Sequence, residues 1–152
     1  MSRVIVLETS GPAPSDTSVT FIAGTRREIV LRHGPPENIV FARLTFGPGA
    51  FADSGLSVTV DVHPRPGVYG LDLATTLQLR GATLSFDYSR YFSGPGRARQ
   101  VYGSDLAFER ALAIGRVLPD NQIELLPSTR PARDNLTADI PAAGSYLVAA
   151  PQ

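Results

Sequence analysis

The stretch Leu56-Ser57-Val58-Thr59-Val60-Asp61-Val62-His63 decides the fold class of this chain. Leucine and valine occupy every second position, and polar residues occupy the positions between them. Successive side chains of a β-strand point to opposite faces, so this alternation predicts an antiparallel strand with one buried face and one wet face.

Similar short runs recur along the chain, separated by turns rich in its 14 glycines and 13 prolines. Such punctuation is typical of strands joined by tight turns. We expect further strands over Arg3–Leu7, Val19–Ile22, Glu28–His33, Ile39–Phe46, Ile123–Leu126, Leu136–Ile140 and Ser145–Ala149.

Three other segments complete the expected layout. Thr76–Arg80 and Thr83–Tyr88 are expected to form a hairpin around Gly81-Ala82, because glycine suits the first position of a type II′ turn. Leu106–Leu118 fits a strand, as its neighbours do, or a helix over Asp105–Ile114 capped by Ser104; we favour the strand.

These elements predict an all-β fold, namely a two-sheet antiparallel β-sandwich with Greek-key, Ig-like connections and few or no helices. Residues 1–152 are expected to form a single domain, because no composition shift or repeat divides them. Residues 1–17 are expected to form an N-terminal strand or arm plus a linker rich in Pro, Gly and Ser, which covers Ser10–Ser18.

The composition excludes several classes of function. The formal net charge is zero, so the chain lacks the basic surface that nucleic-acid binding needs. The absence of cysteine excludes thiolate catalysis, disulfides and cysteine-based zinc sites. No apolar run approaches the length of a membrane span, and Arg3–Leu7 is too short for the apolar part of a signal peptide.

The C-terminal half of the chain resembles the ZU5-type β-sandwich, a module found beside adhesion, receptor and bacterial surface sequences. The segments that carry the resemblance are Gly67–Leu71, Ala82–Tyr88, Ile123–Ser128, Asn135–Ile140 and Gly144–Val148. Some members of that family cleave themselves at a His-Phe-Ser sequence before the last strand. Here Ala142-Ala143-Gly144-Ser145 stands at that place, so the resemblance implies the fold and not the cleavage.

Gly47-Pro48-Gly49-Ala50-Phe51-Ala52 matches the spacing of a dinucleotide-binding fingerprint. That motif needs a helix directly after the glycines, with its N–H groups aimed at the pyrophosphate. Here Asp53-Ser54-Gly55 begins another turn. We therefore predict a β-turn loop and no nucleotide site.

Other reactive residue types occur singly. His33 and His63 are expected at strand ends, facing solvent or capping a turn, and we predict no metal site and no cofactor. The sequence has no Gly-x-Ser-x-Gly motif. The acidic side chains expected on solvated strand faces, rather than as a catalytic pair, are Asp61, Asp72, Asp87, Glu109 and Glu124.

Two loops hold oxygen ligands that calcium could use, Asp120-Asn121 and Asp134-Asn135. Neither repeats the Asp-x-Asp spacing that supplies several ligands from one turn, so we predict Asx-type turns. Asn135-Leu136-Thr137 is an N-glycosylation sequon, which matters only in a eukaryotic secretory pathway.

The segment 89–104 shows no strand pattern and holds aromatic residues, a glycine-proline turn and arginines, a composition common in contact surfaces. It could bind a carbohydrate or peptide, or it could cover the open end of the sandwich. The residues concerned are Tyr91, Phe92, Arg97, Arg99 and Tyr102.

We therefore expect a non-enzymatic structural or protein-interaction module, from a bacterial surface or exported protein. One alternative is a self-assembling subunit, a virion decoration or filament protein, whose N-terminal arm pairs with a neighbour's sheet edge. The other is a carbohydrate- or peptide-binding domain that uses residues 89–104. Membrane insertion and nucleic-acid binding are not expected.

Overall fold

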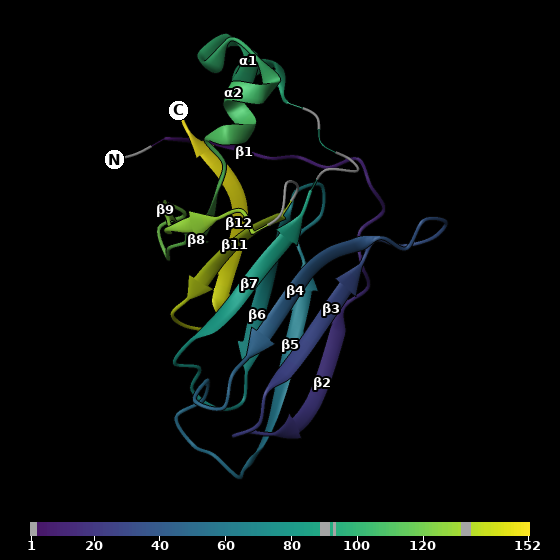
Figure 1. The fold of residues 1–152 in the computed structure, drawn as a ribbon, viewed down its shortest axis with the longest axis vertical. Helices are drawn as coiled ribbons and strands as arrows, with labels where there is room; N and C mark the ends of the chain where they lie inside the picture. Colours follow the sequence, from purple (N-terminus) through teal and green to yellow (C-terminus); the bar gives the residue numbers. More distant parts are fainter. Residues whose placement is uncertain (1–2, 89–91, 93, 132–134) are drawn as a thin grey trace.

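The computed structural model describes residues 3–88, 92, 94–131 and 135–152, and it confirms the two-sheet antiparallel β-sandwich. The two sheets pack against each other around one apolar core, and two short helices lie beyond one end of the sandwich (Figure 1). The core residues come from both sheets, from the N-terminal strand and from the helical end.

The larger sheet has seven strands, all paired antiparallel. In spatial order, six of them are β2 (Thr17–Ile22), β5 (Ser57–Pro64), β6 (Gly70–Thr75), β12 (Gly144–Pro151), β8 (Ala113–Val117) and β9 (Ile123–Leu125). The seventh, β1 (Val4–Val6), pairs with the C-terminal part of β12.

The smaller sheet has five antiparallel strands. Their spatial order is β10 (Ser128–Thr129), β11 (Asn135–Ile140), β7 (Ala82–Asp87), β4 (Val40–Phe46) and β3 (Arg27–Arg32).

The strand β5 has the alternation that the sequence predicts. Val58, Val60 and Val62 are fully buried between the sheets, whereas Thr59 and Asp61 lie on the outer face. The prediction is wrong for Leu56, which is 52% exposed. Leu56 precedes the strand, which begins at Ser57, so the alternation of the strand does not extend to it.

The strand β4 contains an irregularity that its sequence pattern hides. Leu31 pairs with Ala42 and Arg32 pairs with Val40, so Phe41 is an extra residue between them. Such a bulge turns two consecutive side chains to one face. Phe41 and Ala42 are therefore both buried, although the alternation predicts that they lie on opposite faces.

The hairpin predicted around Gly81-Ala82 is wrong. β6 ends at Thr75 and pairs with β5 and β12, whereas β7 begins at Ala82 and pairs with β4 and β11. Residues 76–81 therefore cross from one sheet to the other instead of turning within one. Leu79 is buried in this crossing and forms an isolated bridge with Phe51.

The helical end corrects two more expectations. The predicted loop over 89–104 contains helix α1 (Gly96–Tyr102), and the predicted strand over Leu106–Leu118 begins as helix α2 (Asp105–Arg110) before β8. The alternative start at Ser104 is the one observed: its side chain accepts a hydrogen bond from the Ala107 N–H at 3.1 Å. Local capping and burial of Phe108 outweigh the strand tendency of the neighbouring segments.

The N-terminal segment is part of the sandwich. β1 places Ile5 in the core, and Leu7, directly after β1, is also buried there; the Leu7 N–H donates to the Val148 carbonyl at 2.9 Å. The linker that follows contacts the end of β3, where Pro12 accepts from the Gly34 N–H at 3.3 Å. The predicted linker is shorter than expected, since β2 already begins at Thr17.

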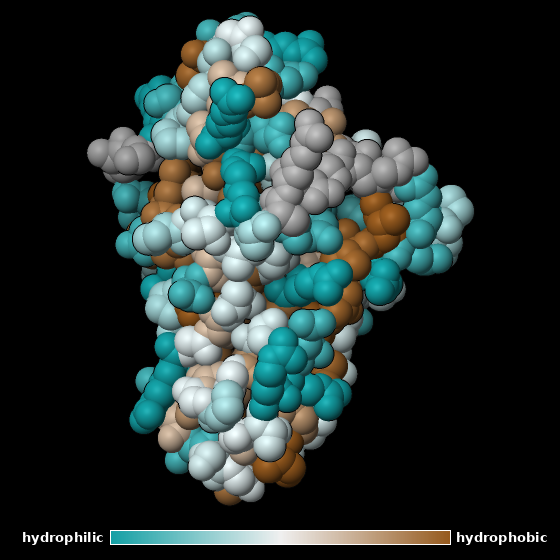
Figure 2. Space-filling model, viewed as in Figure 1, coloured by the Kyte–Doolittle hydropathy of each residue, from teal (hydrophilic) through white to brown (hydrophobic). Residues whose placement is uncertain are grey.

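The outer face of the five-stranded sheet is polar, as Figure 2 shows by its pale and teal surface over β4, β7 and β11. Hydroxyl groups pair across neighbouring strands of this face. Ser85 and Thr137 approach to 3.0 Å between their oxygens, and Thr83 donates to Asp139 at 3.2 Å. This is the wet face that the alternation in 83–88 predicts.

Candidate functional site

The edge strand β2 differs from the other exposed sheet edges of the described residues. β1, β9 and β10 are only two or three residues long, and short edges offer few backbone groups to another chain. β2 and β3 each have six residues. The sandwich therefore has two edges that are long enough to pair with a further strand.

The edge β3 is protected and β2 is not. β3 carries Arg27, Glu28 and Arg32, and the bulge lies beside its C-terminal end. Charges and bulges are common devices against unwanted strand pairing. β2 reads Thr-Ser-Val-Thr-Phe-Ile, without a charge or a proline, and its register with β5 runs unbroken over all six residues.

The backbone pattern shows which groups β2 directs outward. Thr59 of β5, opposite Thr20, uses both of its backbone groups toward Thr76: its N–H donates to Thr76 Oγ1 at 2.9 Å, and its carbonyl accepts from the Thr76 N–H at 3.1 Å. Thr20 must then direct its own N–H and carbonyl away from β5. The same holds for Ser18 and Ile22, because every second residue of the strand points the same way.

The side chains of β2 make its inner face apolar. Val19 and Phe21 pack against the core but remain partly exposed at the edge. The Phe21 ring lies 6.0 Å from the Phe46 ring and 6.1 Å from the Phe51 ring, and the Arg27 guanidinium lies over it at 5.6 Å. On the outer face Ile22 is 54% exposed.

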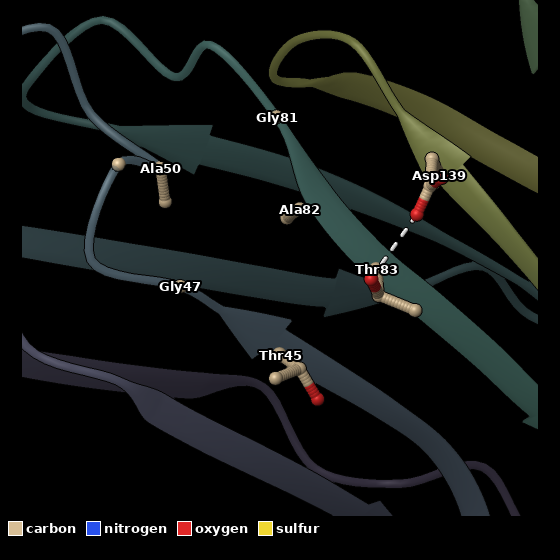
Figure 3. Close-up of a pocket in the computed structure, with 8 residues that line it drawn as sticks. Thr45, Gly47, Ala50, Gly81, Ala82, Thr83 and Asp139 are labelled. Carbon is tan, nitrogen blue, oxygen red and sulfur yellow. Dashed lines mark hydrogen bonds between the residues drawn. The ribbon is translucent and has the colours of Figure 1, made fainter.

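A shallow pocket lies where β4 ends and β7 begins in the five-stranded sheet, beside the predicted glycine loop. It has a volume of about 370 Å³, and Figure 3 shows Thr83 hydrogen-bonded to Asp139 on one side and Gly47 and Ala50 on the other. The Ala50 N–H donates to the Gly47 carbonyl at 3.1 Å, and no helix follows. This confirms the predicted turn; the pocket's one charged group, Asp139, would repel a phosphate.

The aromatic residues of 92–108 contact one another. Ring centroids lie 5.9 Å apart for Tyr102 and Phe108, and 6.4 Å apart for Phe92 and Phe108. The Tyr102 hydroxyl donates to the Pro151 carbonyl, and Arg99 forms an ion pair with Asp105 at 3.1 Å. Tyr91 lies outside the described residues.

The cluster of Tyr88, Glu109 and Arg130 fastens α2 to the sandwich. The Tyr88 hydroxyl donates to Glu109 Oε2 at 2.9 Å, and Arg130 donates to that hydroxyl and to the Glu109 carbonyl. Burial, followed by the hydrogen bond to Glu109, raises the pKa of Tyr88 to about 12, against the opposing effect of Arg130.

This raised pKa predicts an alkaline loss of stability. The unfolded chain releases the tyrosine proton near its ordinary pKa of 10.0, whereas folded Tyr88 keeps it until about 12. The stabilisation is therefore complete below about pH 10 and is lost as the pH rises toward 12. Between about pH 8 and about pH 11, the urea midpoint of Tyr88→Phe should fall less than that of the wild type.

The comparison with wild type isolates Tyr88, because burial also raises the pKa of Tyr146 and that residue is unchanged in the variant. Equal alkaline losses in the two proteins would contradict the assignment.

The two histidines differ in environment. His33 lies directly after β3, as predicted, but it does not face solvent, because its side chain is 1% exposed. Its ring meets those of Phe41 and Tyr69 edge to face at 5.2 and 6.0 Å, and its Nδ1 lies 2.9 Å from the Pro12 carbonyl oxygen. His63 lies at the surface as predicted, 3.1 Å from Asp16.

The predicted acidic residues do not form one site. Asp72 accepts hydrogen bonds from Arg65 at 3.0 Å and from Ser145 at 2.5 Å, whereas Glu109 belongs to the Tyr88 cluster. Among the residues that the structure describes, no three histidine or carboxylate groups are close enough to hold a metal ion.

The predicted Asx turn at Asp120 is confirmed, with Oδ1 accepting from the Gln122 N–H at 3.2 Å. Asn121 has a φ of 64°, which suits a turn. Asp134 lies outside the described residues.

No family model, curated protein or solved structure matches this chain. In the described part of the chain, neither helix is long and apolar enough to cross a membrane. The fold and its surfaces define the class as an all-β, two-sheet sandwich with one unprotected long edge.

Proposed function

We propose that this chain is a non-enzymatic protein-interaction module that binds an extended segment along β2. The observation that carries the proposal is the contrast between the two long edges: β3 carries charged residues and lies beside the bulge of β4, whereas β2 is uncharged and regular. An extended segment that adds to a sheet edge gains main-chain hydrogen bonds, and the side chains of the edge strand give selectivity.

The other two expected surfaces are already engaged within the chain. β1 pairs with β12 of its own sheet, so assembly through the N-terminal arm would require exchange of that strand between copies. In the region 89–104, Tyr102 and Arg99 already bond to Pro151 and Asp105. At β2 a partner would displace a weaker contact, the long hydrogen bond from Thr25 Oγ1 to the Ile22 carbonyl at 3.4 Å. The resemblance to ZU5-type modules supports an extracytoplasmic setting.

A proline at position 20 tests the proposal. Thr20→Pro removes an N–H that points away from β5, so the sheet should stay folded while the outer edge loses a donor. Thr20→Ala keeps that donor and is the matched control. From a displayed library of extended peptides, we expect binders whose affinity falls at least about tenfold in Thr20→Pro and is retained in Thr20→Ala.

Far-ultraviolet circular dichroism and the urea midpoint show whether Thr20→Pro is folded. If it is not, Thr20→Lys places a charge on the same edge and serves instead. Peptides that bind equally well to the wild type and to the edge variants would place the binding surface elsewhere.

A further inference from the structure

We infer that the segment that β2 accepts is β2 of a second copy of this chain, paired antiparallel across a two-fold axis at Thr20. The inference rests on the proposed function, because it names the partner of the same edge. An isologous dimer of this kind would join the two seven-stranded sheets into one continuous sheet.

The backbone register favours an axis at Thr20. With Thr20 opposite the second copy's Thr20, Ser18 lies opposite Ile22 in both directions. These three residues are the ones that direct their N–H and carbonyl groups outward. An axis between Thr20 and a neighbouring residue would pair outward-directed residues with inward-directed ones. An axis at Val19 or Phe21 keeps outward-directed residues opposite each other, but it places Ile22 or Ser18, respectively, opposite a residue outside β2. An axis at Ser18 or Ile22 would leave even more of each strand unpaired.

The side chains fit the same register. Val19 lies opposite the second copy's Phe21, on the inner face, where both side chains are only partly buried in the single chain. Residues of non-hydrogen-bonded pairs approach most closely, and a branched aliphatic side chain opposite an aromatic one is a favourable cross-strand pair. Pairing would extend the apolar core across the edge twice, once on each side of the axis.

The charges at the two ends of β2 select the antiparallel direction. Asp16, 70% exposed and 3.1 Å from His63, precedes the strand, and Arg26, 66% exposed and 3.6 Å from Glu28, follows the turn after it. Antiparallel pairing brings the acidic end of each copy to the basic end of the other, whereas parallel pairing places like charges together. Exposed charges contribute little affinity but steer orientation.

The contact is a single strand pair and is therefore small, so we expect a weak dimer that dissociates on dilution. β3, whose Arg27 lies over the Phe21 ring of β2, carries charged residues at the neighbouring edge (Figure 1), so only the seven-stranded sheets would join. One carbonyl is already engaged, since Ile22 accepts a long hydrogen bond from Thr25 Oγ1 at 3.4 Å.

Cysteine cross-linking tests both the partner and the register, because the chain has no cysteine of its own. Opposite residues of a hydrogen-bonded pair lie about 5.5 Å apart between their Cα atoms, within the range of a disulfide. Thr20→Cys should therefore form a covalent dimer under mild oxidation. Thr59→Cys, on the same face but one strand inward, is the matched control and should stay monomeric.

Cysteine at position 18 tests whether the two-fold axis lies at Thr20. Ser18→Cys alone should not cross-link, because Ser18 lies opposite Ile22, whereas the double variant Ser18→Cys, Ile22→Cys should.

In sedimentation equilibrium over a concentration series, the mass of the wild type should rise from monomer toward dimer. Thr20→Pro should remain monomeric and Thr20→Ala should behave as the wild type.

A wild type that stays monomeric throughout, with Thr20→Cys cross-linking no faster than Thr59→Cys, would overturn the inference. The proposed function survives that result if extended peptides still bind and Thr20→Pro still weakens them. A dimer that persists in Thr20→Pro would place the contact on another surface and also overturn the inference. If the wild type neither dimerises nor binds any extended peptide, both proposals are overturned.

Discussion

Phe41→Ala is expected to lower the free energy of unfolding by about 3–5 kcal/mol, the usual cost of truncating a buried phenylalanine. Phe41 is 1% exposed and lies at the centre of an aromatic cluster. Its ring stacks on Tyr69 at 5.4 Å and meets Phe86 and His33 edge to face at 5.7 and 5.2 Å. Alanine would leave a cavity bordered by three rings.

This cost depends on the bulge in β4. Without the extra residue between the pairs Leu31–Ala42 and Arg32–Val40, Phe41 would face solvent and its truncation would change stability little. Urea denaturation monitored by circular dichroism gives the free energy of unfolding. Leu56→Ala is the control: Leu56 is 52% exposed, so its loss should cost no more than about 0.5 kcal/mol. Equal costs for the two variants would contradict the bulged register.

The sequence predicts alternation within single strands, but it does not predict strand register or the connections between sheets. The valines of β5 and the hydroxyl groups of β7 alternate as their sequence predicts, because alternation follows from the geometry of a single strand. The bulge at Phe41 escaped prediction because it depends on the register with β3. The crossing over residues 76–81 cannot be predicted from the local sequence, because a glycine that suits a hairpin turn also suits a connection between two sheets.

The helical end shows the same limit. Ser104 and the helix-forming residues after it are compatible with a helix, but the local sequence is also compatible with a strand. The helix is favoured by packing of Phe108 against Tyr102 and Phe92, which no local pattern reveals. The strand-end position of His33 predicts an imidazole that faces solvent or caps a turn, but the aromatic rings that bury it lie in segments distant in the sequence.

The candidate site was partly visible in the sequence. Val19–Ile22 was predicted as a strand, and the uncharged composition of Thr17–Ile22 could be read directly. Its position at an edge could not, because that follows from which strands pair: β5 lies on one side of β2 and no described strand lies on the other. Strand order within a sheet is set by contacts between distant segments.

Gly70→Ala is the second substitution expected to have a large effect, lowering the free energy of unfolding by about 1–3 kcal/mol through overpacking. A Cβ at Gly70 would lie 2.9 Å from the Tyr146 carbonyl oxygen and 3.1 Å from the Leu147 Cβ. Both atoms are fixed by the pairing of β12 with β6, so neither can move aside without breaking the ladder. The Arg65 side chain, 3.3 Å away, is the one neighbour that could yield.

The reason for a glycine here lies in Leu147, which faces the outside of the seven-stranded sheet and is nevertheless 5% exposed. Gly70 lies on one side of it and Gly115 on the other, and these two gaps leave room for Arg65 and Ile123 to cover it. Gly49→Ala is the matched control, because a Cβ there meets nothing within 4 Å. If Gly49→Ala and Gly70→Ala had the same urea midpoint, the close approach of β6 to β12 would be refuted. A lower urea midpoint in Gly70→Ala alone shows that packing, and not chain flexibility, requires the glycine.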